Sequence, residues 1–143
     1  MSESGTLLHV WAAGRQLLLP VQELREVTAF TPVTPLPGGP RGIEGVVLNQ
    51  AEFLPVFDWG VLSDGTGSLP QATVMAVLRR RLGLPLERLI GTLAAPPTGW
   101  RGSPDGDPWH PILAGFWMVG EQELPLLDPD RLLALLHRLR MDR

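Results

Sequence analysis

Apolar and polar residues alternate along the first part of the chain in the pattern of short β-strands. Within Leu7–Ala12 every even-numbered position is apolar, which predicts a strand with one buried face. Ala13-Gly14 is a turn signal, so Gln16–Leu19 is expected to return as the second strand of a hairpin. Pro20 should end the ladder of backbone hydrogen bonds. Val21–Val27, with apolar residues at helical spacing, predicts a short helical turn.

The pattern then changes to an extended segment followed by a second pair of strands. Phe30–Pro37 contains three prolines, which exclude a helix. Gly45–Leu48 and Glu52–Phe57 predict two strands joined by a turn at Asn49-Gln50-Ala51. Thr73–Leu78 is apolar almost throughout, as is typical of a strand buried on both faces.

One helix is predicted, at the C-terminus over residues 129–141. Asp128-Pro129 combines an N-cap aspartate with a proline at the first helical position, which is a strong start signal. Arginines gather at the C-terminal end, where they complement the helix dipole. An apolar stripe faces one side of the helix and is formed by Leu132, Leu133, Leu135, Leu136 and Leu139.

Part of the chain repeats at a constant offset of seventy residues. Gly45 and the block Leu54–Asp58 return as Gly115 and the block Leu124–Asp128, with glycine, leucine, proline and aspartate in register. A repeat of about half the chain length predicts two similar halves, neither of which can bury its apolar face alone. The alternative is that the match arose by chance in a chain that is rich in leucine and proline.

A second block supports the duplication. Leu19–Leu24 is answered by Leu84–Leu89, and the two blocks have the same order in both halves. Leu113–Val119 and Gln122–Leu127 repeat the strand pair that surrounds the first turn. The Gly-, Ser- and Pro-rich residues 63–70 are expected to form the seam between the halves. Many short strands, frequent turns and one terminal helix predict an all-β protein with one or two barrels.

Composition narrows the range of functions. The 143 residues fit one domain, which is large enough for a proper hydrophobic core. There is no cysteine, so disulfides, thiolate metal sites and cysteine nucleophiles are excluded. The net charge of −3 makes nucleic acid an improbable partner, and the basic run Arg79-Arg80-Arg81 is expected to be a solvated turn. The short apolar run near the N-terminus resembles neither a signal peptide nor a membrane span, so a cytoplasmic location without membrane insertion is expected.

Residues that could carry out chemistry are scarce. The three histidines have no metal-ligand spacing, and neither a metal site nor a cofactor is expected. Asp58 and Asp128 occupy equal places in the two halves, so a catalytic pair of carboxylates is one interpretation. The favoured interpretation is that each aspartate caps a turn or a helix. The tryptophans Trp59, Trp100, Trp109 and Trp117 are either core residues or interface anchors.

The ordered series of blocks resembles the CheW-like coupling domain of bacterial chemosensory systems. The series runs from Leu19–Val27 through Thr34–Pro37 and Gly45–Val47 to Leu54–Asp58. The resemblance implies two intertwined five-stranded SH3-like barrels. The first barrel would be formed mainly by residues 14–68. The second would be formed mainly by residues 69–128 plus the N-terminal strand, and the C-terminal helix 129–141 follows.

Members of this family are non-enzymatic adaptors, which implies partners but no cofactor. They join the regulatory domain of a CheA-type histidine kinase to the cytoplasmic tip of a chemoreceptor, in chemotaxis or in pilus or gliding motility. The receptor tip would lie in a groove near Glu26, Val33, Leu36 and Gln50. Kinase docking would involve residues on the rims of the barrels, namely Phe53, Trp59 and Trp117.

The chain departs from the family pattern at several places, including Trp59-Gly60 after Asp58 and a shortened segment after Leu89. Gln50 stands where the family has an arginine that contacts partners, and an amide cannot replace the charged fork of a guanidinium. The proline-rich stretch 95–111 is extended relative to the family, and loops of this length are often functional. The alternative to an adaptor is a duplicated small-barrel enzyme or ligand-binding protein that uses Asp58 and Asp128.

Overall fold

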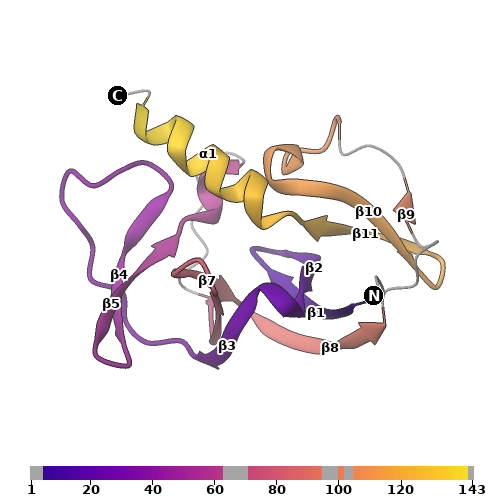
Figure 1. The fold of residues 1–143 in the computed structure, drawn as a ribbon, viewed down its shortest axis with the longest axis horizontal. Coiled ribbons are helices and arrows are strands. Elements are labelled where there is room, and N and C mark those ends of the chain that lie inside the picture. The colour runs from indigo at the N-terminus through magenta and orange to yellow at the C-terminus, as the bar shows by residue number, and fades with distance from the viewer. Residues whose placement is uncertain (1–4, 63–70, 95–99, 102–104, 142–143) are drawn as a thin grey trace.

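The computed structural model describes residues 5–62, 71–94, 100–101 and 105–141 (Figure 1). These residues form an almost entirely β structure with one α-helix, as predicted. The elements in chain order are β1 (Thr6–Ala12), β2 (Arg15–Pro20), the 3₁₀ turn η1 (Val21–Glu23), β3 (Leu24–Ala29), β4 (Ile43–Asn49), β5 (Glu52–Phe57), η2 (Trp59–Leu62), β6 (Val74–Leu78), β7 (Leu82–Leu86), β8 (Arg88–Ala94), β9 (Trp100–Arg101), η4 (His110–Ile112), β10 (Leu113–Val119), β11 (Gln122–Leu127) and α1 (Pro129–Met141).

The strands form two sheets that exchange hairpins. The six-stranded sheet has the order β8-β1-β2-β11-β10-β9, and the five-stranded sheet has the order β3-β6-β7-β5-β4. The first sequence repeat spans β1 to η2, and the second repeat spans β6 to α1. Each sheet therefore takes its inner hairpin, β1–β2 or β6–β7, from one repeat and the strands around that hairpin from the other. The intertwined arrangement that the resemblance implied is built in this way.

The hydrogen-bond register repeats together with the sequence. In the five-stranded sheet β5 meets β7 in a parallel bridge between Val56 and Gly83. In the six-stranded sheet β11 meets β2 in the equivalent bridge between Leu126 and Leu18. A register shift lies between Ile43 and Gly45 in one hairpin and between Leu113 and Gly115 in the other. The seventy-residue offset is therefore a property of the fold as well as of the sequence.

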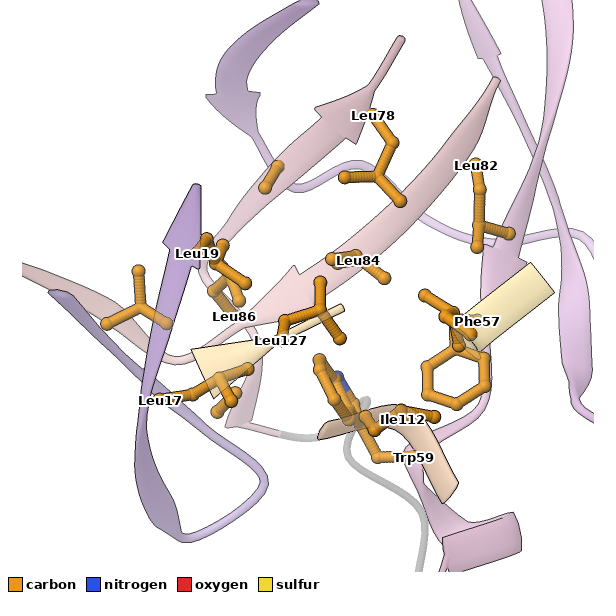
Figure 2. Close-up of a cluster of buried hydrophobic side chains, with 14 of the residues drawn as sticks. Leu17, Leu19, Phe57, Trp59, Leu78, Leu82, Leu84, Leu86, Ile112 and Leu127 are labelled. Atoms are coloured by element: carbon orange, nitrogen blue, oxygen red, sulfur yellow. The ribbon is translucent and has the colours of Figure 1, made fainter. Parts of the chain in front are cut away.

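The hydrophobic side chains described here form a shared core and two smaller sheet cores. The shared core lies between the sheets and includes residues of β1, β2, β7, η2, β11 and α1. Figure 2 shows Leu17 and Leu19 of β2 together with Phe57, Trp59 and Ile112. The core of the five-stranded sheet is formed by Val47, Leu54, Val56, Met75 and Val77. The core of the six-stranded sheet is formed by Leu7, Leu18 and Leu124, with Trp117 and Leu126 packed against them.

The terminal helix connects the two sheets. As predicted, Asp128 caps α1: its Oδ1 accepts a hydrogen bond of 3.0 Å from the backbone N–H of Asp130. Leu132 and Leu135 are buried in the shared core. The helix also passes close to Gly42, where an added Cβ would lie 2.7 Å from Leu136. In Figure 1 the helix runs across the top of the view between the β4–β5 and β10–β11 hairpins. Within the described part of the chain, none of the helices has the length and apolarity to cross a membrane.

One detail of the secondary structure differs from the predictions. Val21–Val27 is not a helical turn throughout, because only η1 is helical and the rest of the segment belongs to β3. The hydrogen bonds of β3 with β6 override the local helical spacing. The sheets do not follow the chain order strictly, since β2 lies in the six-stranded sheet while β6 and β7 lie in the five-stranded sheet. The predicted seam at 63–70 lies outside the described residues.

The extended segment after β3 links the two edges of the five-stranded sheet. β3 and β4 are its edge strands, and Thr34 forms a bridge with Val46 of β4 through hydrogen bonds of 2.8 and 2.9 Å. Gly45 makes this approach possible, because a Cβ on Gly45 would overlap the carbonyl oxygen of Thr34. A backbone carbonyl cannot rotate away as a flexible side chain would.

We therefore expect Gly45→Ala to lower the free energy of unfolding by roughly 1–3 kcal/mol, because the new methyl group overpacks against the backbone. Gly91→Ala is the matched control, since no atom lies within 4 Å of a Cβ on Gly91 in β8. Urea denaturation followed by tryptophan fluorescence measures both variants. Equal stability of the two variants would contradict the steric role of Gly45.

Candidate functional site

The β4–β5 hairpin ends in a tight turn that carries two exposed apolar side chains. Gln50 and Ala51 both have positive φ, 50° and 67°, and Asn49 pairs with Glu52 across the turn. Leu48 and Phe53 lie directly opposite one another on the two strands, and 62% and 74% of their surfaces are exposed. We call these two residues the hairpin patch. Large apolar side chains with this exposure, side by side, are typical of a docking surface.

A network of charged side chains holds the hairpin in place. Glu52 accepts a hydrogen bond of 3.2 Å from Arg25 of β3 and one of 2.7 Å from Arg81 in the β6–β7 turn. Arg25 also donates to the side-chain oxygen of Asn49 at 3.1 Å. These hydrogen bonds, first from Arg25 and then from Arg81, lower the pKa of Glu52. The network ties the tip of a first-repeat hairpin to a turn that belongs to the second repeat.

The structure brings together two of the residues predicted for the receptor groove. The side-chain amide of Gln50 donates hydrogen bonds to both carboxylate oxygens of Glu26, at 3.2 and 3.4 Å. A register shift in β3 between Leu24 and Glu26 places Arg25 in a β-bulge. Because a bulge breaks the alternation of side chains, Arg25 and Glu26 can both reach the same hairpin turn.

Glu26 also lines a groove between the two sheets. The groove has a volume of about 280 Å³. Leu8 of β1 and Leu24 of β3 are its buried apolar residues, and Thr92 of β8 belongs to the opposite sheet. The complete lining is Leu8, Val21, Leu24, Arg25, Glu26, Val27 and Thr92. A predominantly apolar groove with charges at its rim has the character of a site for a helix or an extended peptide.

The other two residues predicted for the groove lie elsewhere. Val33 packs against the core of the five-stranded sheet. Leu36 is 44% exposed on the extended segment that follows β3. Neither residue lines the groove. The sequence placed both on the extended segment after β3, but it did not indicate which way that segment turns.

Trp59 is a core residue, contrary to the expectation that it docks a partner. Only 1% of its surface is exposed, and its indole N–H donates to the carbonyl oxygen of Pro85 at 2.8 Å. Its ring stacks on Trp109 at a centroid distance of 4.8 Å and meets Phe57 edge-on at 5.1 Å. Figure 2 shows it beside Phe57 and Ile112. The interpretation of the tryptophans as core residues is correct for Trp59 and Trp109.

Trp117 has an intermediate position. It is half-buried against the core of the six-stranded sheet and lines a pocket of about 190 Å³ together with Leu7, Pro20 and Leu126. Trp117 corresponds to Val47 at the seventy-residue offset, and Val47 is buried in the core of the other sheet. Trp117 is therefore only partly exposed, and its ring nitrogen is buried.

The described end of the proline-rich stretch 95–111 is held against the shared core. Asp107 forms an ion pair with Arg15 of β2 at 2.9 Å and accepts a hydrogen bond from the backbone N–H of Trp109 at 2.8 Å. The guanidinium of Arg15 also lies over the Trp109 ring, 4.7 Å from its centroid. Burial acts to raise the pKa of Asp107, but the hydrogen bonds from Arg15 and Trp109 outweigh it and the pKa is lowered.

The two aspartates of the alternative interpretation have structural tasks. Asp58 Oδ1 accepts a hydrogen bond of 2.8 Å from the N–H of Gly60 at the start of η2. Asp128 makes the equivalent contact at the start of α1. Both are caps, as the favoured interpretation predicted, and this geometry does not favour a catalytic pair. Among the residues described, no group of three or more acidic or histidine side chains is arranged to hold a metal ion.

The basic run in the β6–β7 turn makes intramolecular contacts. Arg79 donates to the carbonyl oxygen of Gln22 at 2.9 Å, and Arg80 forms an ion pair with Asp130 of α1 at 2.7 Å. Arg81 contacts Glu52 in the charged network. The turn is exposed, as predicted, but its side chains also contact other elements, and two of its three positive charges, those of Arg80 and Arg81, are in ion pairs.

Comparisons with known proteins agree with this architecture. The family model of the CheW-like domain matches residues 6–137. The chain belongs to the CheW-like domain family. Membership assigns it to the non-enzymatic scaffolding proteins of chemotaxis signalling. Among solved structures, the scaffolding protein TtCheW from Thermoanaerobacter tengcongensis is similar in fold, with a TM-score of 0.75 and 13% identity over 90% of this chain and 86% of that one. A search of curated protein sequences returns no match.

Two features of this CheW-like domain were missed at the level of sequence. Leu48 was not singled out, although it follows the inward-facing Val47 and so falls on the outward face of β4. The apolar character of an outward position was the available signal. Glu52 was also missed, because its two arginine partners lie 27 and 29 residues away in sequence.

The turn of the hairpin provides a prediction about stability. A left-handed backbone conformation costs an alanine about 1 kcal/mol relative to glycine. Ala51→Gly should therefore raise the free energy of unfolding by about 1 kcal/mol. Ala29→Gly, at the end of β3 where φ is not positive, should lower it by about 0.5–1 kcal/mol. Chemical denaturation measures both, and a loss of stability in Ala51→Gly would contradict the argument.

Glu44 makes the stability dependent on pH. Burial, and then the nearby charge of Asp58, raise its pKa from 4.5 to about 7, and its Oε2 is buried without a hydrogen-bond partner. Between these two pH values the folded state therefore keeps a proton on Glu44 that the unfolded state has released. Stability should fall as the pH rises from about 4.5 to about 7, by on the order of 1–2 kcal/mol once solvent screening of this partly exposed side chain is allowed for.

Glu44→Gln should remove this pH dependence and be the more stable form at pH 8. Thermal unfolding between pH 4.5 and 8 measures the effect. Glu123→Gln, at an exposed position of β11, is the control and should keep the slope of the wild type. The same slope in Glu44→Gln and in the wild type would show that another group is responsible.

Proposed function

We propose that this CheW-like domain is a cytoplasmic adaptor that joins a chemoreceptor to the regulatory domain of a CheA-type histidine kinase. The observation that carries the proposal is the presence, on a chain of this family, of two neighbouring surfaces formed by different side chains. One is the groove between the sheets, and the other is the hairpin patch of Leu48 and Phe53. An adaptor needs two such surfaces, whereas a module with a single partner needs only one.

The groove is the proposed site for the receptor tip. Its apolar residues come from both sheets, and Glu26, which accepts hydrogen bonds from Gln50, forms part of its polar rim. An amphipathic helix placed there would bury its apolar face against Leu8, Leu24 and Val27. In the proposal Val33 and Leu36 contribute from the neighbouring extended segment, where Leu36 offers an exposed apolar side chain.

The hairpin patch is the proposed kinase-docking surface. Phe53 is the most exposed large apolar side chain among the described residues, and Leu48 lies beside it. Exposed aromatic side chains are frequent hot spots in protein interfaces. Trp117 is a proposed second contact because it is partly exposed, while Trp59 has no place in the interface because it is buried.

The charged network lies between the two surfaces. Arg25 lines the groove and binds Glu52, and Glu52 neighbours Phe53 in the hairpin. A partner that moves the groove wall therefore acts on the strand that carries the hairpin patch. In this proposal the charged network couples the receptor site to the kinase-docking surface.

Phe53→Ala tests the kinase surface. We expect the dissociation constant for the regulatory domain of the organism's CheA-type kinase to rise at least tenfold, because an exposed aromatic anchor is lost. The unfolding midpoint should not change, since the side chain is mostly exposed. Met141→Ala, which removes another exposed apolar side chain on α1, is the control and should bind like the wild type.

Titration calorimetry measures the affinities. Binding of the wild type with a micromolar dissociation constant, about −8 kcal/mol, and a negative heat-capacity change would support the adaptor role. Failure of the wild type to bind would refute the kinase assignment. Equal affinity of Phe53→Ala and the wild type would place the kinase on a different surface.

A further inference from the structure

Glu26 is a groove carboxylate with a neutral partner. Its two oxygens accept the hydrogen bonds from the Gln50 amide, at 3.2 and 3.4 Å. Among the described residues, no lysine, arginine or histidine lies within ion-pair distance of Glu26. The side chain is half-buried and lines the groove, so its charge faces the space that a partner would enter.

Nearby carboxylates differ from Glu26 in this respect. Glu52, in the same hairpin, has both Arg25 and Arg81. Glu23, three residues before Glu26, has Arg80 at 3.7 Å. The arginines around the groove are therefore already engaged with other acidic groups. The groove rim thus contains one carboxylate whose charge is not compensated within the described part of the chain.

A partner that covers Glu26 must compensate this charge. Moving a carboxylate out of water costs free energy unless a cation or several donors replace the lost hydration. The single amide of Gln50 supplies donors but no charge. An acidic partner residue would be repelled, whereas a cation would gain a partly desolvated ion pair.

We propose that the receptor segment bound in the groove presents a lysine or arginine to Glu26, next to its apolar face. This inference rests on the proposed function of the groove as the receptor site. Gln50 then acts as a specificity-determining residue, because it orients the Glu26 carboxylate without neutralising it. The occupant is an amphipathic helix with a basic residue beside its apolar stripe.

A substitution of Gln50 can test whether Glu26 needs a positive charge from the partner. An arginine at position 50 would place a guanidinium next to Glu26 and supply the missing charge internally. The same guanidinium would repel a basic residue of the partner. Gln50→Arg should therefore weaken binding of a basic receptor segment, although the substitution adds a residue that is common in interfaces.

The experiment measures binding of a recombinant cytoplasmic tip of a chemoreceptor from the same organism. Titrations at several salt concentrations compare the wild type with Glu26→Gln, Gln50→Arg and the control Glu123→Gln. We expect the first two variants to bind roughly three- to tenfold more weakly and with a smaller dependence on salt. Glu123→Gln has the same change in net charge on the exposed side of β11, and it should bind like the wild type.

Substitutions in the tip complete the test. Each lysine and arginine of the tip is changed to glutamine, and one of these changes should weaken binding to the wild type but not to Glu26→Gln. If Glu26→Gln binds as tightly as the wild type, or if Gln50→Arg binds more tightly, the inference is wrong while the receptor role stands. If the wild type does not bind the tip at all, the receptor role fails, and the inference fails with it.

Discussion

The exchange of hairpins between the two repeats is the constraint on which the rest of the structure depends. Neither repeat contains the strands of a complete sheet, because β6–β7 completes the sheet of the first repeat and β1–β2 completes that of the second. The parallel bridges Val56–Gly83 and Leu126–Leu18 are the points where the exchanged hairpins join their hosts. The shared core follows directly, since the exchanged strands carry apolar side chains on the faces that meet between the sheets. Separating the halves would expose this core and leave both sheets incomplete.

The same exchange places the candidate surfaces. The groove forms where β3 of one sheet meets β1 and β8 of the other. The hairpin patch belongs to the first repeat, yet its support comes partly from Arg81 in the second repeat. Surface pairs of this kind contribute little to stability individually. Here the ion pair matters for its location, because Glu52 links the groove residue Arg25 to the strand that carries Phe53.

The sequence was sufficient to predict features set by local chemistry. The cap at Asp128-Pro129 predicted α1, the turn at Asn49-Gln50-Ala51 predicted the β4–β5 hairpin, and the seventy-residue offset predicted the duplication. Features set by contacts between residues far apart in the sequence were harder to predict. The helical spacing of Val21–Val27 was misleading because β3 obtains its hydrogen bonds from β6, about fifty residues later. Trp59 follows a strand and precedes a glycine, as a surface residue would, but Trp109 and Pro85 enclose it.

Comparison of equivalent positions in the two repeats shows how one duplicated framework acquired two different ends. The pair Leu48 and Phe53 corresponds to Met118 and Glu123, which also lie opposite one another, so an apolar pair in one hairpin is a mixed pair in the other. Asp58 and Asp128 keep the same capping contact, but the first opens a short 3₁₀ turn and the second a helix of 13 residues. The two repeats thus share their backbone register and their caps, because both sheets need these features to enclose the exchanged hairpins. Outward-facing side chains are free of that requirement, and the difference in chemistry between the two ends of the molecule is found there.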